Sequence, residues 1–253
     1  MRLSEFDFSY PTELIARYPS QIRGESRLII AHRKTQEIIH TTFSKMVDFL
    51  ETGDCLVVNQ SRVFPARLFG QKETGGEVEL LLLENISGNR WKCLAFPLKR
   101  LRPGVRIFFP LDHSEPNCHS EPNCHSEPKA RNLLSAETIE VQEAHVVVDF
   151  NSEGAPPEGE FQKIPALIEK IGHIPIPPYL GRQDEAIDQE RYQTIFANQS
   201  GSVAAPTAGL HWTEGLIREV SEIGVEVVPI TLHVGQGTFA VIREEQIQNH
   251  KMH

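Results

Sequence analysis

The chain has no long apolar segment. Its longest leucine run, Leu80–Leu83, is far shorter than the roughly 20 apolar residues that cross a bilayer. The N-terminal stretch MRLSEFDFSYP lacks the apolar core of a signal peptide. Cysteine is scarce too, and Cys55 and Cys93 lie in strand-like apolar runs, where free cysteine packs as a small hydrophobic residue. We therefore expect a reduced, cytoplasmic protein with no membrane partner.

The common nucleotide and metalloprotease motifs are missing. There is no Walker loop, and the glycines at Gly235 and Gly237 lack the later glycine and helix of a dinucleotide fingerprint. No HExxH pair is present either. The sequence thus predicts no prosthetic group and no metal site.

Acidic residues are in excess overall but absent from one stretch. The formal net charge of −9 argues against a nucleic-acid partner, which usually requires a basic surface. From Asn85 to Leu111, however, there is no acidic residue, and the cationic residues there are Arg90, Lys92, Lys99, Arg100, Arg102 and Arg106. The stretch is either a solvated basic face or a patch for phosphates, and composition does not decide between them.

The order of the patterns predicts an α/β fold with an insertion. Alternating element types fill residues 1–62, including DCLVVNQ, an apolar run typical of a strand buried on both faces. Short strands and turns fill residues 63–150. Helical patterns return after Gln162, in RYQTIFAN and in TEGLIREVSEIG, which Thr213 caps and Gly224 ends. We expect a mixed-sheet α/β main domain (1–62 and 151–253) and an inserted β domain (63–150) whose two ends lie close together.

A perfect repeat, HSEPNC HSEPNC HSEP, lies at residues 113–128 inside the expected insertion. Its cysteines and histidines invite a zinc interpretation, but each Cys is followed directly by His, and no apolar residue anchors a fold. The composition favours an exposed low-complexity loop.

Two similar stretches each place a histidine among small residues. VAAPTAGLHWTEG contains His211, and TLHVGQGTF contains His233. Small residues let a backbone approach a ligand, and histidine transfers protons near neutral pH. A lone histidine is more often structural, but the pair together favours a site. We expect the two histidines to face each other across a cleft with Arg62 near its mouth.

Two further stretches each have a functional and a structural interpretation. In NQSRVFPARL, Arg62 and Arg67 are either an anion clamp or surface arginines of a polar loop. In GHIPIPPYLGR, His173 and Tyr179 lie on a proline-stiffened segment that either crosses the surface or presents an aromatic ring to a base.

Six motifs in this order resemble one family, the S-adenosylmethionine:tRNA ribosyltransferase-isomerases of queuosine biosynthesis: NQSRVFPARLFG, GHIPIPPY, RYQTIFA, GSVAAPTAGLHW, TLHVGQGTF and HKMH. The resemblance implies transfer and isomerisation of the ribosyl group of S-adenosylmethionine onto 7-aminomethyl-7-deazaguanine at the tRNA wobble position. Epoxyqueuosine-tRNA forms, and adenine and methionine leave. It further implies S-adenosylmethionine as co-substrate, a tRNA with a GUN anticodon as partner, a β-barrel as the inserted domain, and a monomer.

The expected site residues follow from these motifs. His211 and His233 are the catalytic candidates, and Lys99, Arg100 and Arg102 are the tRNA-binding candidates. The substrate-binding candidates are Asn59, Arg62, Arg67, His173, Tyr179, Ala205, Pro206, Thr207, Gly209, Gly235 and Gly237.

The chain departs from the family pattern in two places. Gln60 and Ser61 stand where the family usually has Asn and Thr, which keeps the amide and the hydroxyl. The sequence stops at His253 inside a family motif, so we expect an incomplete pocket and little ribosyl transfer. The alternatives are a non-catalytic RNA-binding fragment, or a metal hydrolase using His211, His233, His250 and His253.

Overall fold

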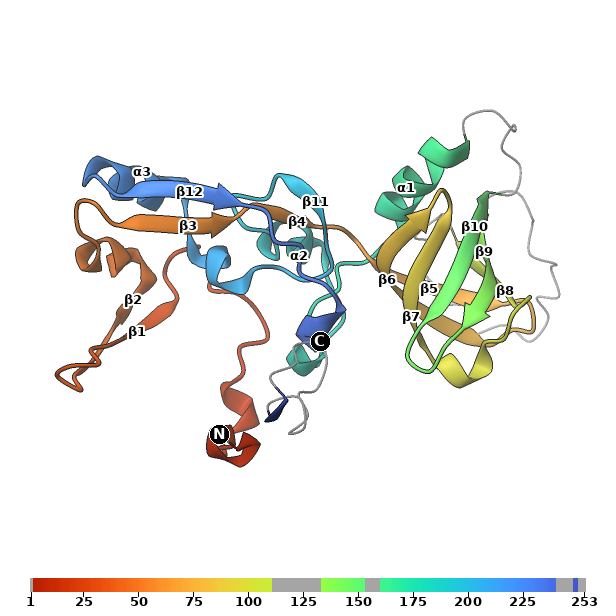
Figure 1. Cartoon of the computed structure of the whole chain (residues 1–253), viewed down its shortest axis with the longest axis horizontal. Helices are drawn as coiled ribbons and strands as arrows, with labels where there is room; N and C mark the ends of the chain where they lie inside the picture. Colours follow the sequence, from red (N-terminus) through yellow and green to blue (C-terminus); the bar gives the residue numbers. More distant parts are fainter. Residues whose placement is uncertain (1, 111–132, 153–159, 240–247, 250–253) are drawn as a thin grey trace. The chain divides into compact units, whose positions relative to one another are not determined.

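A computed structural model describes residues 2–110, 133–152, 160–239 and 248–249. The chain divides into two compact units, shown in Figure 1. Unit 1 comprises Met1–Val63 and Ile176–His253, and unit 2 comprises Phe64–Pro175. We propose that these units are the two domains. The second boundary then lies beyond the expected residue 150, because α1 (Glu160–Ile171) buries Ile164 and Ile168 within unit 2.

Unit 2 contains a closed antiparallel barrel of six strands in the order β10-β7-β6-β5-β8-β9. The expected fold class, α/β with an inserted β-barrel, is confirmed. The 3-10 turn η4 (Leu98–Arg100) joins two of the strands. The strands are β5 (Arg67–Lys72), β6 (Glu77–Ser87), β7 (Arg90–Phe96), β8 (Arg106–Pro110), β9 (Leu133–Val141) and β10 (Val146–Ser152).

Alternation along the strands fills the barrel interior. On β6, Val78, Leu80 and Leu82 are buried while Glu77 is exposed, the period-two pattern of a half-buried strand. Phe109 and Phe150 meet inside with ring centroids 5.9 Å apart. Cys93 is fully buried, and burial raises the pKa of its thiol, so it packs as the small hydrophobic residue that the sequence predicts.

The two ends of unit 2 are tied together. Arg67 N–H donates to the His173 carbonyl at 3.2 Å, and His173 N–H donates back to the Arg67 carbonyl at 2.8 Å. Gly172 permits this approach, because a Cβ there would collide with the Pro65 and Ile168 carbonyl oxygens. The chain therefore leaves unit 2 close to the point where it enters, as we expect of an inserted domain.

In its described residues, unit 1 contains three two-stranded sheets. β1 (Arg27–Ala31) pairs antiparallel with β2 (Ile38–Thr42), whereas the other two pairs are parallel and join segments far apart in sequence. These are β3 (Cys55–Asn59) with β12 (Glu226–Ile230), side by side in Figure 1, and β4 (Ser61–Val63) with β11 (Gln199–Ser202). The helices in the described part of this unit are α2 (Ala186–Arg191) and α3 (Glu214–Glu222). Its 3-10 turns are η1 (Leu3–Phe6), η2 (Thr12–Leu14), η3 (Phe43–Phe49), η5 (Pro178–Leu180), η6 (Thr207–His211) and η7 (Gln236–Phe239).

The helix α3 forms as its sequence predicts. Thr213 caps it by accepting a hydrogen bond from Leu216 N–H at 3.2 Å, and Gly224 follows its end with a φ of +86°. Its buried face, Leu216 and Val220, packs into a core cluster with Phe43 and Trp212.

Two expected elements differ from the structure. The strand in DCLVVNQ exists, but Val57 is 55% exposed and Cys55 is exposed, so it is not buried on both faces. RYQTIFAN is not a helix: α2 ends at Arg191, and the Gln193 side chain instead bonds both backbone groups of Val63. In the second case a tertiary partner, rather than local pattern, decides the outcome.

The HSEPNC repeat at residues 113–128 lies outside the described residues. In the part of the chain that is described, no helix is both long and apolar enough to cross a membrane.

Candidate functional site

The carboxyl ends of β3 and β12 are held together by Asn59. Its amide Nδ2 donates to the Leu232 carbonyl at 2.8 Å, while its Oδ1 accepts from Leu232 N–H at 3.1 Å and from Ser61 N–H at 3.0 Å. Next to it, Gln60 Nε2 donates to Thr231 Oγ1 at 2.9 Å. The motifs NQSRV and TLHVG therefore meet at one edge of a parallel pair, where α/β folds commonly bind ligands.

A buried pair of serines joins a third motif to this edge. Ser202 Oγ donates to Ser61 Oγ at 2.7 Å and accepts from Val234 N–H at 2.9 Å, and both serine residues are fully buried. Val203 N–H donates to the Val234 carbonyl at 2.8 Å. Since every buried polar atom here has a partner, the three backbones are fixed relative to one another.

His233 lies against the backbone of Gly201. A Cβ at Gly201 would come within 2.8 Å of His233 Cε1 and 2.9 Å of Nδ1, and the Gly201 φ is +141°. This glycine interrupts the pairing of β11 with β4 between Ser200 and Ser202. The His233 side chain is otherwise exposed, so the glycine sets where the imidazole sits.

Replacing Gly201 by alanine should displace the His233 ring and reduce the free energy of unfolding by about 1–3 kcal/mol, the usual cost of a strained backbone position. His233 ring resonances in NMR spectra and thermal unfolding would measure both effects. Gly235→Ala is the matched control, because a Cβ at Gly235 meets nothing within 4 Å. Equal behaviour of the two variants would contradict this assignment.

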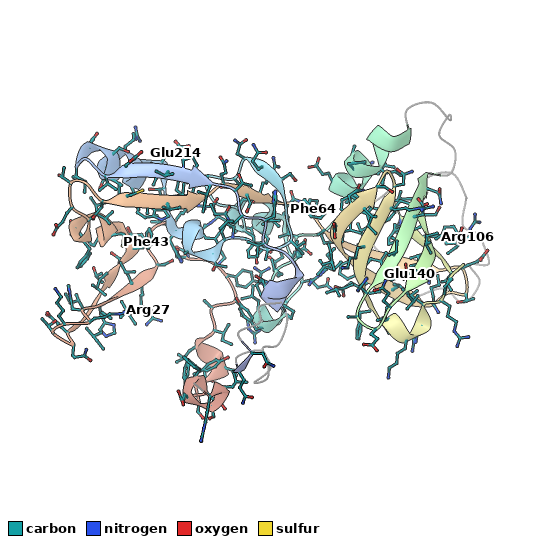
Figure 2. The ribbon with its side chains drawn as sticks, viewed as in Figure 1. Arg27, Phe43, Phe64, Arg106, Glu140 and Glu214 are labelled. Atoms are coloured by element: carbon teal, nitrogen blue, oxygen red, sulfur yellow. The ribbon has the colours of Figure 1, made fainter. Side chains whose placement is uncertain are left out.

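His211 occupies a more enclosed position. Its Nδ1 lies 3.1 Å from Ser26 Oγ, and its ring packs on Phe43 with centroids 5.2 Å apart. Figure 2 labels Phe43, which also meets Trp212 edge-on. Burial, and secondarily the charge of Arg23, lower the pKa of His211 below its usual 6.5. His211 is therefore mainly neutral at pH 7, with Nδ1 engaged by Ser26.

The Arg23 guanidinium braces the segment that carries His211. Its Nη1 donates to the carbonyl of Leu210 at 3.1 Å and of Gln193 at 2.9 Å, and its Nη2 donates to the carbonyl of Glu190 at 3.3 Å. One cation thereby holds a carbonyl from each of two motifs and a third just before the first motif. Burial lowers the pKa of that guanidinium without neutralising it at pH 7.

The motifs RYQTIFA and GSVAAPTAGLHW pack on each other. A Cβ at Gly209 would lie 2.8 Å from Thr194 Cγ2, so Gly209 allows this contact. Burial raises the pKa of Tyr192 to about 12, while a backbone hydrogen bond with Ala205 acts in the opposite direction. Ala205 is buried, Pro206 half-buried and Thr207 exposed at the start of η6.

The remaining candidates in unit 1 are accessible. Arg62 is exposed on β4, and Tyr179 on η5 is 66% exposed. Gly235 is exposed and Gly237 is half-buried in η7. Among the described residues, no hydrogen bond or ring contact joins His211 to His233. Their approach across a cleft with Arg62 at its mouth remains a prediction.

Five candidates belong to unit 2. Arg67 Nε lies 3.0 Å from Glu79 Oε1, so its charge already has a partner, and His173 packs its ring edge-on against Phe69 with centroids 5.0 Å apart. The tRNA-binding candidates Lys99, Arg100 and Arg102 are exposed.

Several residues of the site were not predicted from the sequence. Arg23 and Ser26 precede the first strand, and Ser202 lies in a stretch noted only for its small residues. One signal could have found the first two: QIRGESRL places polar residues around Gly24, whose φ of +93° marks a tight turn. His250 and His253 lie outside the described residues, and in the described ranges no three potential metal ligands cluster.

Comparison with known proteins finds one consistent similarity. A family model described as "Queuosine biosynthesis protein" matches residues 3–253. The S-adenosylmethionine:tRNA ribosyltransferase-isomerase of Carboxydothermus hydrogenoformans is 41% identical over 253 residues, and the protein of the same name from Caldanaerobacter subterraneus subsp. tengcongensis is 43% identical over 255. Each match covers 100% of this chain, which spans 66% of the length of either relative.

Among solved structures, the crystal structure of an S-adenosylmethionine tRNA ribosyltransferase from Thermotoga maritima is 28% identical. The alignment covers 91% of this chain and 58% of that one, with a TM-score of 0.34. At that score, the similarity lies in the sequence and supports no argument about the arrangement of the fold.

Proposed function

Because this chain belongs to the family of queuosine biosynthesis proteins, we propose that it transfers and isomerises the ribosyl group of S-adenosylmethionine. The acceptor is 7-aminomethyl-7-deazaguanine at the wobble position of a tRNA with a GUN anticodon. The products are epoxyqueuosine-tRNA, adenine and methionine. The names of the relatives from Carboxydothermus hydrogenoformans and Caldanaerobacter subterraneus support this reaction. S-adenosylmethionine is then a substrate rather than a resident cofactor. The proposal also takes the protein to act as a cytoplasmic monomer.

One observation carries the proposal. The motifs at Asn59–Val63, Gly201–Val203 and Thr231–Val234 are far apart in sequence, yet they are joined by hydrogen bonds at the carboxyl ends of β3 and β12. A small-molecule site at this edge agrees with where α/β sheets bind ligands.

The two histidines suit different steps. Breaking the bond to adenine is easier when a ring nitrogen of the adenine is protonated, and activation of the ribose 5′ carbon beside the sulfonium requires a base. We assign the base to His211, which is mainly neutral at pH 7, and to the tautomer in which Nδ1–H donates to Ser26 Oγ. In that tautomer Nε2 carries no proton and can accept one. His233, placed by Gly201, orients the substrate. Arg62 meets a phosphate or the substrate carboxylate.

Adenine release tests the proposal directly. The purified chain is supplied with S-adenosylmethionine and tRNA that carries 7-aminomethyl-7-deazaguanine at the wobble position. Chromatography should detect adenine and methionine, and mass spectrometry should detect a heavier tRNA. The same tRNA with guanine at that position is the control and should give neither. If the modified tRNA yields no adenine, the proposed activity of this chain is wrong, and the little ribosyl transfer expected from the sequence is the correct prediction.

A further inference from the structure

The most exposed aromatic side chain of the barrel is Phe96, the last residue of β7. It is 74% exposed, as much as any large hydrophobic residue of the described chain. Lys92 and Leu94 lie on the same outer face of β7 as Phe96, because Cys93 between them points into the core. An isolated exposed hydrophobic residue needs no explanation, so the surroundings of Phe96 decide whether it has a role.

The carboxylate opposite Phe96 on the neighbouring strand forms an ion pair. Phe96 lies directly opposite Glu79 in the pairing of β6 with β7. Glu79 Oε1 is 3.0 Å from Arg67 Nε, and the Arg67 side chain is only 16% exposed. Phe96 thus presents its ring beside an ion pair rather than beside a free negative charge.

Three cations follow Phe96 in the turn to β8. Leu101 is 3% exposed and anchors this turn in the barrel, so its neighbours Lys99, Arg100 and Arg102 are directed outward, and all three are exposed. Figure 1 shows the turn as the short yellow helix at one end of the barrel. No ion pair occupies these three side chains in the described part of the chain. We name Phe96, Lys99, Arg100 and Arg102 the Phe96 strip.

Acidic residues border the strip at the same end of the barrel. The turn between β5 and β6 carries Glu73, and β6 begins with Glu77. The end of β9 with the turn that follows carries Glu140 and Glu143, and all four are exposed. Figure 2 labels Glu140, together with Arg106 at the start of β8. A broad duplex laid over this end would bring its phosphates near these carboxylates and be repelled, whereas a narrow single strand would follow the cations alone.

We propose that the Phe96 strip binds an unpaired nucleotide of the tRNA, with a base stacked on the Phe96 ring and the adjoining phosphates held by Lys99, Arg100 and Arg102. This rests on the proposed function, which makes tRNA the substrate. Stacking on an aromatic ring accepts any base, and guanidinium and ammonium groups bind phosphate without reading sequence. The strip therefore contributes affinity for an unpaired region rather than recognition of the modified base.

The test measures binding of the whole chain to a tRNA transcript with a GUN anticodon, and to a fully paired RNA duplex of equal length, over a series of salt concentrations. Phe96→Ala should weaken tRNA binding about tenfold without changing the salt slope, because no charge is removed. Phe96→Trp should retain it. The triple change Lys99→Gln, Arg100→Gln and Arg102→Gln should weaken binding and flatten the slope. Ile86→Ala is the matched control, an apolar residue 51% exposed on β6.

Each result supports or overturns the proposal. Equal tRNA binding by Phe96→Ala and Ile86→Ala overturns it, as does an equal loss of affinity for the paired duplex. Circular dichroism and thermal unfolding confirm that Phe96→Ala folds, and retained binding by Phe96→Trp separates stacking from loss of structure. If the unaltered chain binds no tRNA, the substrate assignment fails as well. If it binds tRNA independently of Phe96, only the strip is wrong.

Discussion

Replacing His211 by alanine should lower adenine release by about 100- to 10,000-fold, the range that a general base contributes to proton transfer. Burial and the charge of Arg23 lower the pKa of His211, and its Nδ1 lies 3.1 Å from Ser26 Oγ. His40→Ala is the matched control, because His40 is an exposed residue of β2 in the same unit. Adenine release near the unaltered rate in His211→Ala would remove His211 from the mechanism.

The pH dependence separates this role from a structural one. The neutral, active form of His211 is lost as the pH falls through its pKa, which burial and Arg23 place below 6.5. The rate should therefore hold down to mildly acidic pH and then fall. Arg23→Gln removes a positive charge, so it should raise the pKa of His211 and move the fall to higher pH. NMR titration of the His211 ring measures the same shift without turnover, and an unchanged pKa would contradict the assignment.

The lowered pKa of His211 also makes the stability of the folded protein depend on pH. An unfolded chain with a histidine pKa near 6.5 binds more protons than the native state between that value and the lowered one. His211 therefore lowers the native stability as the pH falls through this window. The effect disappears in the His211→Ala variant.

Replacing Asp188 by alanine should lower the free energy of unfolding by about 3–5 kcal/mol, the cost of leaving a buried charge without its partner. Arg182 Nη1 and Nη2 donate to the two Asp188 carboxylate oxygens at 2.6 and 2.8 Å, with side chains only 10% and 4% exposed. Arg182 Nε donates to the Arg17 carbonyl at 2.8 Å, and its guanidinium stacks 4.5 Å from the Tyr18 ring. Loss of Asp188 should thus also loosen the N-terminal segment.

Urea unfolding of the purified chain measures this cost. Glu190→Ala is the matched control, since Glu190 is an exposed carboxylate on the same helix. Burial alone would raise the pKa of Asp188, but hydrogen bonds from Arg182 and from Glu185 N–H lower it overall. Its contribution is therefore complete above pH of about 4 and is lost as the pH falls through the lowered pKa. Equal stability of the two variants would show that the ion pair is not required.

The sequence predicted the elements whose local pattern and tertiary surroundings agree. Helix α3 has an N-cap, an apolar face and a terminal glycine, and each signal points to the same structure. The barrel strands alternate in the same consistent way. The predicted helix in RYQTIFAN is wrong because the Gln193 amide instead completes the hydrogen bonds of Val63. That partner is distant in sequence, and no local pattern indicates it.

The candidate site was partly predictable for a related reason. Glycines near a histidine indicate a place where the backbone is closely approached by another group. At Gly201 that group is the ring of His233. The residues that position the site, such as Arg23 and Ser202, act on backbone groups of other segments. A side chain that holds a distant carbonyl or amide has no sequence spacing to reveal it.

The tie between the two ends of unit 2 has a consequence for the order of folding. β3 and β12 pair across an interval that contains the whole of unit 2, and ordering so long a chain is entropically costly and slow. The barrel strands are contiguous in sequence and are synthesised before β12, so the barrel can close first. Once Arg67 and His173 have paired, the folded barrel holds its two ends together. The flexible chain between β3 and β12 is then about one third as long as before. Closing it then costs about 1 kcal/mol less. During synthesis, the folded barrel would therefore make the pairing of β3 with β12 easier, because it shortens the loop that this pairing must close.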